Sequence, residues 1–374
     1  MLEKVIFILA FGTLAFLVAM LFAPIFIRFL EKNKLGQQIR LQAVDGGLAP
    51  LFRALHLKKM GTPTMGGILI WGTVIAMIFI SFIPQTLGIT RFNLWNPNET
   101  YLPAFSLITV GLLGLIDDWF NITGRGKEKG LHFKPKTFWL SLFALLGAVW
   151  FYFKLGCLDG VADPILFEQA FLGTFYSPEV CLIHVPRLGD FNFSFFYIPF
   201  FIFVIIASAN AVNLTDGLDG LAGGLLIIAF VSFGILAFAK GLFLLATFCA
   251  VVVGALVAFL WWNVPPARFF MGDTGSYSLG ATLGVIAMLT NSIVPLFFIA
   301  AVFILETLSV IIQLIAKKVW NQKVFLIAPF HHHLEKVGWT EAQIVMRFWL
   351  IGAVLAGLGL ILGLLGMGEF SFSF

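Results

Sequence analysis

The stretch NLTDGLDGLAGG (residues 213–224) lies between two apolar runs, FFYIPFFIFVIIASA (195–209) and LLIIAFVSFGILAFA (225–239). A helix of about 20 residues, rising 1.5 Å per residue, crosses a hydrocarbon core about 30 Å thick. The 374-residue chain is 60% hydrophobic and 11% charged, against roughly 25% charged in soluble domains. The composition excludes an ordinary soluble protein, and we expect Asp216 and Asp219 to lie at a membrane boundary.

Similar apolar runs recur along the chain and predict an all-α polytopic membrane protein with about ten transmembrane helices in one domain, residues 1–374. The first run is longer than a signal-peptide core of about 7–15 residues, so we interpret it as a retained helix. The expected spans are 5–30, 66–83, 101–116, 137–155, 196–212, 220–239, 242–262, 276–290, 294–316 and 346–366.

The basic residues predict the orientation of these spans. With ten crossings the odd-numbered loops share one side, and 18 of the 23 Lys and Arg residues lie there or beside it. The other five are Lys4, Arg91, Lys154, Arg187 and Lys240. The positive-inside rule makes the odd loops cytoplasmic, so both termini are expected to be periplasmic. A periplasmic loop is expected at about 156–195, where Cys157 and Cys181 form either a disulfide or two unpaired thiols.

Five short motifs then fall on the expected cytoplasmic face. They are GTPTMGG (61–67), IDDW (116–119), NLTDGLDG (213–220), MGDTGS (271–276) and HHHLE (331–335). The acids of these motifs have two interpretations. They mark or cap helix ends, with Asp117 and Asp118 ending the third span and Thr215 or Asn213 capping the sixth, or they form one site.

Capping alone does not explain five converging carboxylates, because like charges a few ångströms apart repel one another unless a cation lies among them. A divalent metal with oxygen ligands, Mg²⁺ above all beside phosphates, satisfies this requirement. The basic residues on the same face suit a phosphorylated anionic substrate, although positive-inside topology alone accounts for most of them. No nucleic-acid partner is expected.

Two further features favour a site. Glu306 and Gln313 lie seven residues apart on the ninth expected span, where an ionisable Glu is either functional or paired with another group. Phe269 and Phe270 precede Gly272; they offer an aromatic platform for a flat ring, or at least one of them packs at the bilayer edge.

The motifs together carry a resemblance. KKMGTPTMGG (58–67), GLIDDW (114–119), KGL (129–131), NAVNLTDGLDGLAGG (210–224), FFMGDTGS (269–276) and APFHHHLEKVGW (328–339) occur in this order. The chain resembles the phospho-N-acetylmuramoyl-pentapeptide transferase family, a branch of the polyprenyl-phosphate sugar-1-phosphate transferases, almost end to end.

The resemblance implies transfer of phospho-N-acetylmuramoyl-pentapeptide from its UDP carrier to undecaprenyl phosphate, with release of UMP and a requirement for Mg²⁺. It also implies ten helices, a homodimer among membrane lipids, and a place in the bacterial inner membrane. The process would be peptidoglycan biosynthesis, and with it cell-wall biogenesis, cell shape and cell division.

The resemblance also implies roles for individual residues. Asp273 would bind Mg²⁺, and Asp117, Asp118 and His332 would be catalytic with it. The expected substrate-binding residues are Lys59, Thr64, Lys129, Lys136, Asn213, Asp216, Asp219, Asn263, Phe270, Gln313, His331 and His333.

A phosphate monoester with a second pKa of about 6 is mostly dianionic at pH 7 and hardly needs a general base. Direct attack by the lipid phosphate is therefore favoured over a covalent intermediate on Asp117 or Asp118. A transporter would place its acids near the bilayer midplane, usually in two repeats, and a scaffold would not need them.

Overall fold

The structure is a computed structural model that describes residues 1–36, 59, 61–88, 92–124, 133–154, 182–186, 188–193 and 196–367. Helices dominate this part of the chain. They are α1 (Leu2–Lys32), α3 (Gly67–Ile80), α4 (Phe82–Thr86), α5 (Tyr101–Thr123), α6 (Phe133–Lys154), α8 (Tyr197–Thr215), α9 (Leu221–Ala239), α10 (Phe243–Asn263), α11 (Gly272–Leu289), α12 (Ile293–Ile299), α13 (Ala301–Trp320), α14 (Phe330–Val337) and α15 (Glu341–Leu365). A small antiparallel hairpin, β1 (Leu182–Val185) and β2 (Gly189–Asn192), pairs Ile183 with Phe191.

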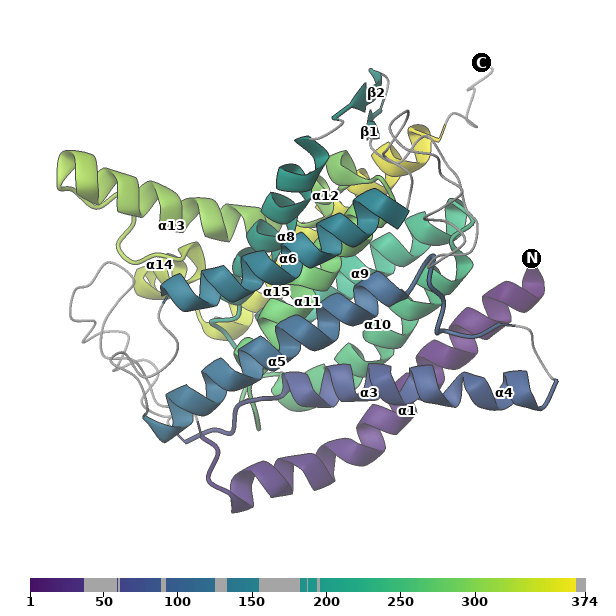
Figure 1. Cartoon of the computed structure of the whole chain (residues 1–374). Helices are drawn as coiled ribbons and strands as arrows, with labels where there is room; N and C mark the ends of the chain where they lie inside the picture. The colour runs from purple at the N-terminus through teal and green to yellow at the C-terminus, as the bar shows by residue number, and fades with distance from the viewer. Residues whose placement is uncertain are drawn as a thin grey trace.

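The predicted class, an all-α polytopic membrane protein, is confirmed. Within the described residues, seven helices are long and apolar enough to cross a membrane, or up to eight if the bent pair α12–α13 is one span. Two further bundle helices, α6 and α11, occupy the fourth and eighth expected positions. The count of ten remains a prediction. In Figure 1, α1 begins and α15 ends on the right, whereas α14 lies on the left.

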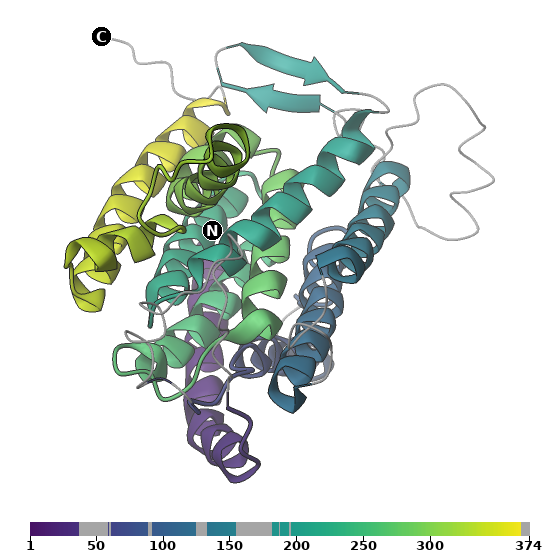
Figure 2. The same cartoon turned by 90° about the vertical axis from the view of Figure 1, so that its left-hand side faces the viewer.

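Helix α11 forms the centre of the bundle and packs against α3, α5 and α8. Figure 2 shows α15 on one flank and the α5–α6 pair on the other. Glycines permit the close crossings: a Cβ on Gly114 would lie 2.2 Å from the carbonyl oxygen of Asp273, and one on Gly67 would lie 2.2 Å from the nitrogen of Gly275. Small residues at such crossings let membrane helices approach closely, which here brings α5 up to the start of α11.

The ninth expected span is not one helix over 294–316. It breaks near Ala300, and α12 and α13 are bent by 78° relative to each other. Beyond the bend Glu306 and Gln313 are buried against other parts of the chain, while Leu305, Leu308 and Ile312 remain exposed. The bend thus directs the polar face of α13 toward protein.

Several helix ends also differ from expectation. Helix α5 continues to Thr123 instead of ending at residue 116, so Asp117 and Asp118 lie inside it. Helix α11 begins at Gly272 instead of 276, and α15 begins at Glu341 instead of 346. The charged side chains in these added turns have ionic or hydrogen-bonding partners, so the helices need not stop at the apolar boundary.

Candidate functional site

Lys136 joins two carboxylates from different helices. Its Nζ lies 2.8 Å from Oδ2 of Asp117 on α5 and 2.5 Å from Oδ2 of Asp273 on α11. The ammonium also sits 4.1 Å from the ring centroid of Tyr277. Three buried or half-buried charges therefore meet where α5, α6 and α11 converge, and the lysine relieves the repulsion between the two acids.

Asn213 also contacts Asp273. Its Nδ2 donates to Oδ1 of Asp273 at 2.6 Å and to Oγ of Ser276 at 2.9 Å. Asn213 lies within α8, and the Thr215 hydroxyl donates to the Ala211 carbonyl of the same helix. The prediction that Asn213 or Thr215 caps the sixth span is therefore wrong, because the Asn213 amide is used across helices.

Asp118 caps the first turn of α11. Its Oδ1 accepts the N–H of Asp273 at 3.1 Å, and its Oδ2 accepts the N–H of Thr274 at 3.0 Å and the Thr274 hydroxyl at 2.6 Å. Asp273 is thus not the N-cap of its own helix. A carboxylate at a helix N-terminus is favoured by the unsatisfied N–H groups and the helix dipole.

The turn between α8 and α9 holds Asp216 and Asp219. Helix α9 begins at Leu221 after Gly220, whose φ of +82° is in the left-handed region that suits glycine. The two acids therefore precede the helix; with Thr215 or Asn213 as its cap they would have lain in its first turn. Asp216 is half-buried, and burial, together with the charges of Asp273, Asp118 and Asp219, raises its pKa to about 8.

Asp219 belongs to a second ionic cluster. Its Oδ1 lies 2.7 Å from Lys59 Nζ, and its Oδ2 accepts the N–H of Ala267 at 3.0 Å. Glu341, at the start of α15, accepts from Lys59 Nζ at 2.6 Å and from the N–H of Asp219 at 2.7 Å. Burial alone would lower the pKa of Lys59, but the hydrogen bonds and charges of Asp219 and Glu341 outweigh it and raise the pKa above its ordinary value.

Asn263 supports the same turn from α10. Its Oδ1 accepts the N–H of Gly220 at 3.0 Å, and its Nδ2 donates to the Phe269 carbonyl at 2.9 Å. It is buried and ties two segments together.

The histidine run lies on α14, and each ring has a different environment. His331 is fully buried and contacts the Glu306 carboxylate through Nδ1 at 3.1 Å. His332 pairs with Glu335 at 2.7 Å. His333 accepts the N–H of Leu326 through Nδ1 at 3.2 Å and stacks on Phe330. His331 and His332 approach the Asp216–Gly217 turn most closely, since a Cβ on Gly217 would lie 2.4 Å and 3.3 Å from their Nε2 atoms.

Phe270 and Thr64 are brought together by backbone pairing. Phe270 donates its N–H to the Pro63 carbonyl at 2.8 Å, and its own carbonyl accepts from Gly66 at 2.8 Å. Phe270 is half-buried, whereas Phe269 is fully buried in edge contact with Phe259 and packs inside the protein.

Thr64 is buried beside the start of α11, where a Cβ on Gly272 would lie 2.7 Å from its hydroxyl and 2.4 Å from Asp118 Oδ2. Gln313 is also buried, but it binds the 324–325 backbone at 3.0–3.1 Å. Lys129, Cys157 and Cys181 lie outside the described residues.

The donor set suits a hard cation that is shared with a substrate. Within the described ranges, no group of three or more His, Cys, Asp and Glu side chains forms a metal site by itself. Mg²⁺ usually keeps several waters and takes one or two carboxylates plus substrate phosphates. Asp117 and Asp273, already close enough to share one ammonium, fit such a partial site.

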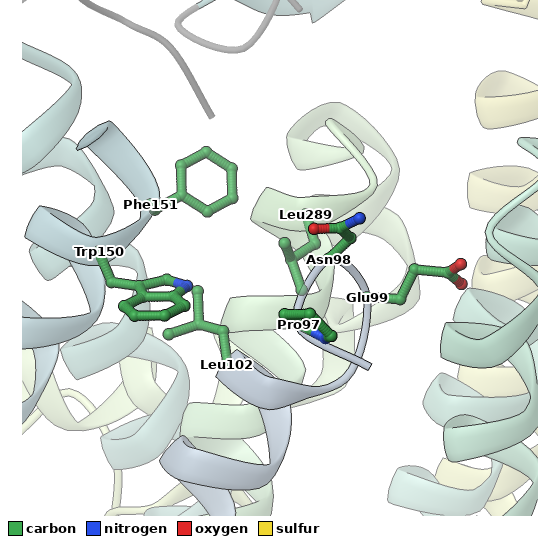
Figure 3. A pocket seen from close by; sticks show the side chains of 7 residues that line it. All are labelled: Pro97, Asn98, Glu99, Leu102, Trp150, Phe151 and Leu289. Carbon is green, nitrogen blue, oxygen red and sulfur yellow. The ribbon is translucent and has the colours of Figure 1, made fainter. Parts of the chain in front are cut away.

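A small pocket, with a volume of only about 10 Å³, lies at the other end of α5. Figure 3 shows it between Pro97, Leu102, Trp150, Phe151 and Leu289, with the Glu99 carboxylate directed away. That carboxylate accepts the N–H groups of Leu244 and Leu245 at 2.8 and 3.0 Å. The pocket is therefore separate from the acidic clusters, and its one acid caps α10.

Sequence reasoning missed several contributors to the clusters, namely Glu341, Thr274, Ser276 and Glu335. Glu341 had a usable signal, because Thr340-x-x-Gln343 has the pattern of a capping box and forms one here. This pattern would have moved the start of the last helix to Glu341. The other three depend on contacts between elements or on a local pairing that no single pattern specifies.

Comparison with known proteins gives a consistent result. The profile of glycosyl transferase family 4 matches residues 100–291. The phospho-N-acetylmuramoyl-pentapeptide-transferase of Geobacillus sp. (strain WCH70) is 38% identical over 348 residues, covering 93% of this chain and 95% of the relative. The enzymes of that name from Oceanobacillus iheyensis (39% over 347 residues; 92% and 94% covered) and Staphylococcus carnosus (36% over 356; 94% and 97%) are similar.

Proposed function

The chain belongs to the phospho-N-acetylmuramoyl-pentapeptide transferases, and from this premise we propose that the cluster of Asp117, Lys136, Asn213 and Asp273 is its phosphoryl-transfer site. The protein transfers phospho-N-acetylmuramoyl-pentapeptide from its UDP carrier to undecaprenyl phosphate. The products are UMP and lipid I, the first lipid-linked precursor of peptidoglycan.

The observation that carries the proposed site is the bridge from Asp117 through Lys136 to Asp273. It gathers two carboxylates and a cation from three helices beside the α8–α9 turn. Mg²⁺ held by Asp273, with Asp117 beside it, would neutralise charge on the diphosphate and on departing UMP. Lys136 would then hold a phosphate oxygen and keep the two carboxylates in place.

In the proposed step, an oxygen of undecaprenyl phosphate attacks the phosphorus bonded to the sugar. The new P–O bond forms as the bond to the UMP oxygen breaks, and UMP leaves as an anion. One phosphate anhydride replaces another, so the driving force is small and catalysis depends on positioning and electrostatics. Asp117 orients the attacking phosphate through Lys136.

Asp118 is a poor candidate for a covalent nucleophile. Three donors from Asp273 and Thr274 hold its two oxygens. Attack by this carboxylate would require uncapping α11, the helix that carries Asp273. These bonds support a single displacement and give Asp118 a positioning role.

The nucleoside end is proposed to lie at the Lys59–Asp219 cluster. Asp219 connects to the segment that precedes Phe270 through the N–H of Ala267. Ionic and amide groups at this cluster suit the polar edge of a base, and the half-buried Phe270 ring would face the uracil. Thr64, Lys129, Gln313 and His333 remain proposed substrate-binding residues, and His332, paired with Glu335, remains a proposed catalytic residue.

The membrane arrangement extends the proposal. The chain is a multi-pass membrane protein, proposed to lie in the bacterial inner membrane with the acidic clusters on the cytoplasmic side and both termini periplasmic. Because α1 begins and α15 ends on the side away from α14 (Figure 1), an even number of crossings is supported. A homodimer is proposed as well.

The deciding assay measures UMP release from the UDP-linked substrate by purified protein in detergent. We expect release only when both polyprenyl phosphate and Mg²⁺ are present, with loss in EDTA and recovery on adding Mg²⁺. Asp273→Asn should abolish release while keeping the melting temperature within a few degrees. A transporter would instead accumulate the intact substrate in proteoliposomes and release no UMP, and that outcome would refute the proposal.

A further inference from the structure

Glu306 is an ionisable residue deep in a membrane helix that none of the steps above uses. It lies on α13, six residues after the bend, and is 1% exposed. An isolated buried carboxylate is costly, so such groups are paired and hydrogen-bonded. In this structure the partner of Glu306 is His331, which is 0% exposed.

The contact between them fixes the histidine at two points. The Glu306 oxygens accept the backbone N–H of His331 at 3.1 and 3.3 Å, and Oε2 lies 3.1 Å from Nδ1. Backbone and ring are held by one carboxylate, which leaves the imidazole one orientation.

The opposite ring nitrogen is unsatisfied. Nε2 of His331 is buried and has no hydrogen-bond partner among the described residues. It faces the turn that carries Asp216, because a Cβ on Gly217 would lie only 2.4 Å from it. A buried polar nitrogen without a partner is unfavourable, so its presence calls for an explanation such as a bound ligand.

The neighbouring histidines differ in this respect. His333 is occupied by the N–H of Leu326 and by Phe330. His332 pairs with Glu335 within the same helix. His331 is linked through Glu306 to the membrane helix α13.

We propose that Glu306 is a positioning residue that holds the His331 ring so that Nε2–H is directed past Gly217 and donates a hydrogen bond to a phosphate oxygen of the bound diphosphate. An N–H donor at a water-poor site then has a strong acceptor in phosphate. This inference rests on the proposed transferase function.

The first test compares Glu306→Gln with Thr307→Val. Thr307 is the next residue of α13, and its hydroxyl bonds only to the Phe303 carbonyl of the same helix in the described contacts. We expect Glu306→Gln to lower kcat about 10–100-fold, as loss of an orienting partner typically does, while Thr307→Val keeps wild-type turnover.

The division of the effect between kcat and KM separates positioning from damage to the helix. An amide has a single acceptor oxygen and cannot hold both the backbone N–H and the ring as the carboxylate does, so Glu306→Gln should lower kcat while KM for the UDP-linked substrate stays near wild type. A Glu306→Gln enzyme with wild-type kcat, or one whose loss appears in KM alone, overturns the inference. In either case, UMP release by the wild-type enzyme in the same assay supports the transferase function independently of this inference.

A second measurement needs no variant enzyme to be active. Nitrogen-15 NMR of the histidine-labelled wild-type protein, with His331 assigned by its loss in His331→Asn, reports the proton on each ring nitrogen. We expect a proton on Nε2 of His331. An Nε2 without a proton overturns the proposal.

Discussion

Asp118 on α5 holds Thr274 on α11 twice, by accepting its N–H at 3.0 Å and its hydroxyl at 2.6 Å through the same oxygen. The neighbouring oxygen accepts the N–H of Asp273 at 3.1 Å. The residue proposed to bind Mg²⁺ thus receives its backbone position from an acid 155 residues earlier in the chain. The adjacent Asp117 contributes its charge to the same site through Lys136.

Loss of this cap should impair turnover by displacing Asp273. Asp118→Ala leaves the N–H groups of Asp273 and Thr274 without an acceptor, at a cost of about 1–3 kcal/mol for each unsatisfied group. We expect a lower melting temperature and a large loss of UMP release. Thr274→Val removes only the hydroxyl donor and should have a smaller effect on both measurements.

A separate experiment on the wild-type enzyme distinguishes a capping role of Asp118 from a nucleophilic one. In single displacement, wild-type enzyme incubated with the UDP-linked substrate and Mg²⁺, but without polyprenyl phosphate, forms no covalent adduct and exchanges no labelled UMP. An intact-mass increase that maps to Asp118 or Asp117 would establish double displacement instead.

Lys136 should be indispensable because it neutralises two carboxylates at once. Lys136→Met leaves Asp117 and Asp273 facing each other, and removal of one preorganised charged donor costs about 10²–10³ in rate. UMP release should fall by that factor. The matched control is Lys240→Met. Lys240 follows α9, and its Nζ donates to the carbonyl of Thr290 at the other end of α11, at 2.5 Å. Lys240→Met should change the melting temperature and leave turnover near wild type. Equal losses of UMP release in Lys136→Met and Lys240→Met would contradict the proposed site.

Glu341 should act on substrate binding more than on the transfer step. Glu341→Ala removes the acceptor for Lys59 and for the N–H of Asp219, so we expect KM for the UDP-linked substrate to rise about tenfold, equivalent to about 1.4 kcal/mol, at nearly constant kcat. Gln343→Ala disrupts the capping box of the same helix without touching Lys59. If both variants shift KM alike, the effect comes from the helix end and the proposed role of Glu341 is wrong.

The sequence was informative wherever a pattern is local. Apolar runs predicted the spans, and the placement of motifs on one face anticipated that Asp117, Lys136, Asn213 and Asp273 would meet, as their contacts confirm. Asp216 and Asp219, expected on the same face, also lie close enough for the charges of Asp273, Asp118 and Asp219 to act on Asp216.

Features that depend on partners far along the chain were not predictable. The residues around Ala300 are continuously apolar, so no signal marked the 78° bend of α12 and α13. Helix ends at Asp117 and Asn213 were placed too early because an acid or amide after an apolar run is expected to meet water. Here Lys136 and Asp273 satisfy those side chains inside protein, and the helices continue.

Asp216 should make the stability of the protein depend on pH. Its pKa in the folded state is raised to about 8, first by burial and then by the charges of Asp273, Asp118 and Asp219, from an ordinary value of 3.8. Between about pH 4 and 8 the folded protein therefore retains a proton that the unfolded chain releases, so this group's contribution to stability is lost as pH rises through the window. Asp216→Asn carries no such proton, and the melting temperature of the variant minus that of wild type, measured in detergent, should grow more positive from pH 5 to 8.5. Measuring both proteins in the same buffers removes the contributions of all other groups, and parallel curves would show that Asp216 is already ionised at pH 5.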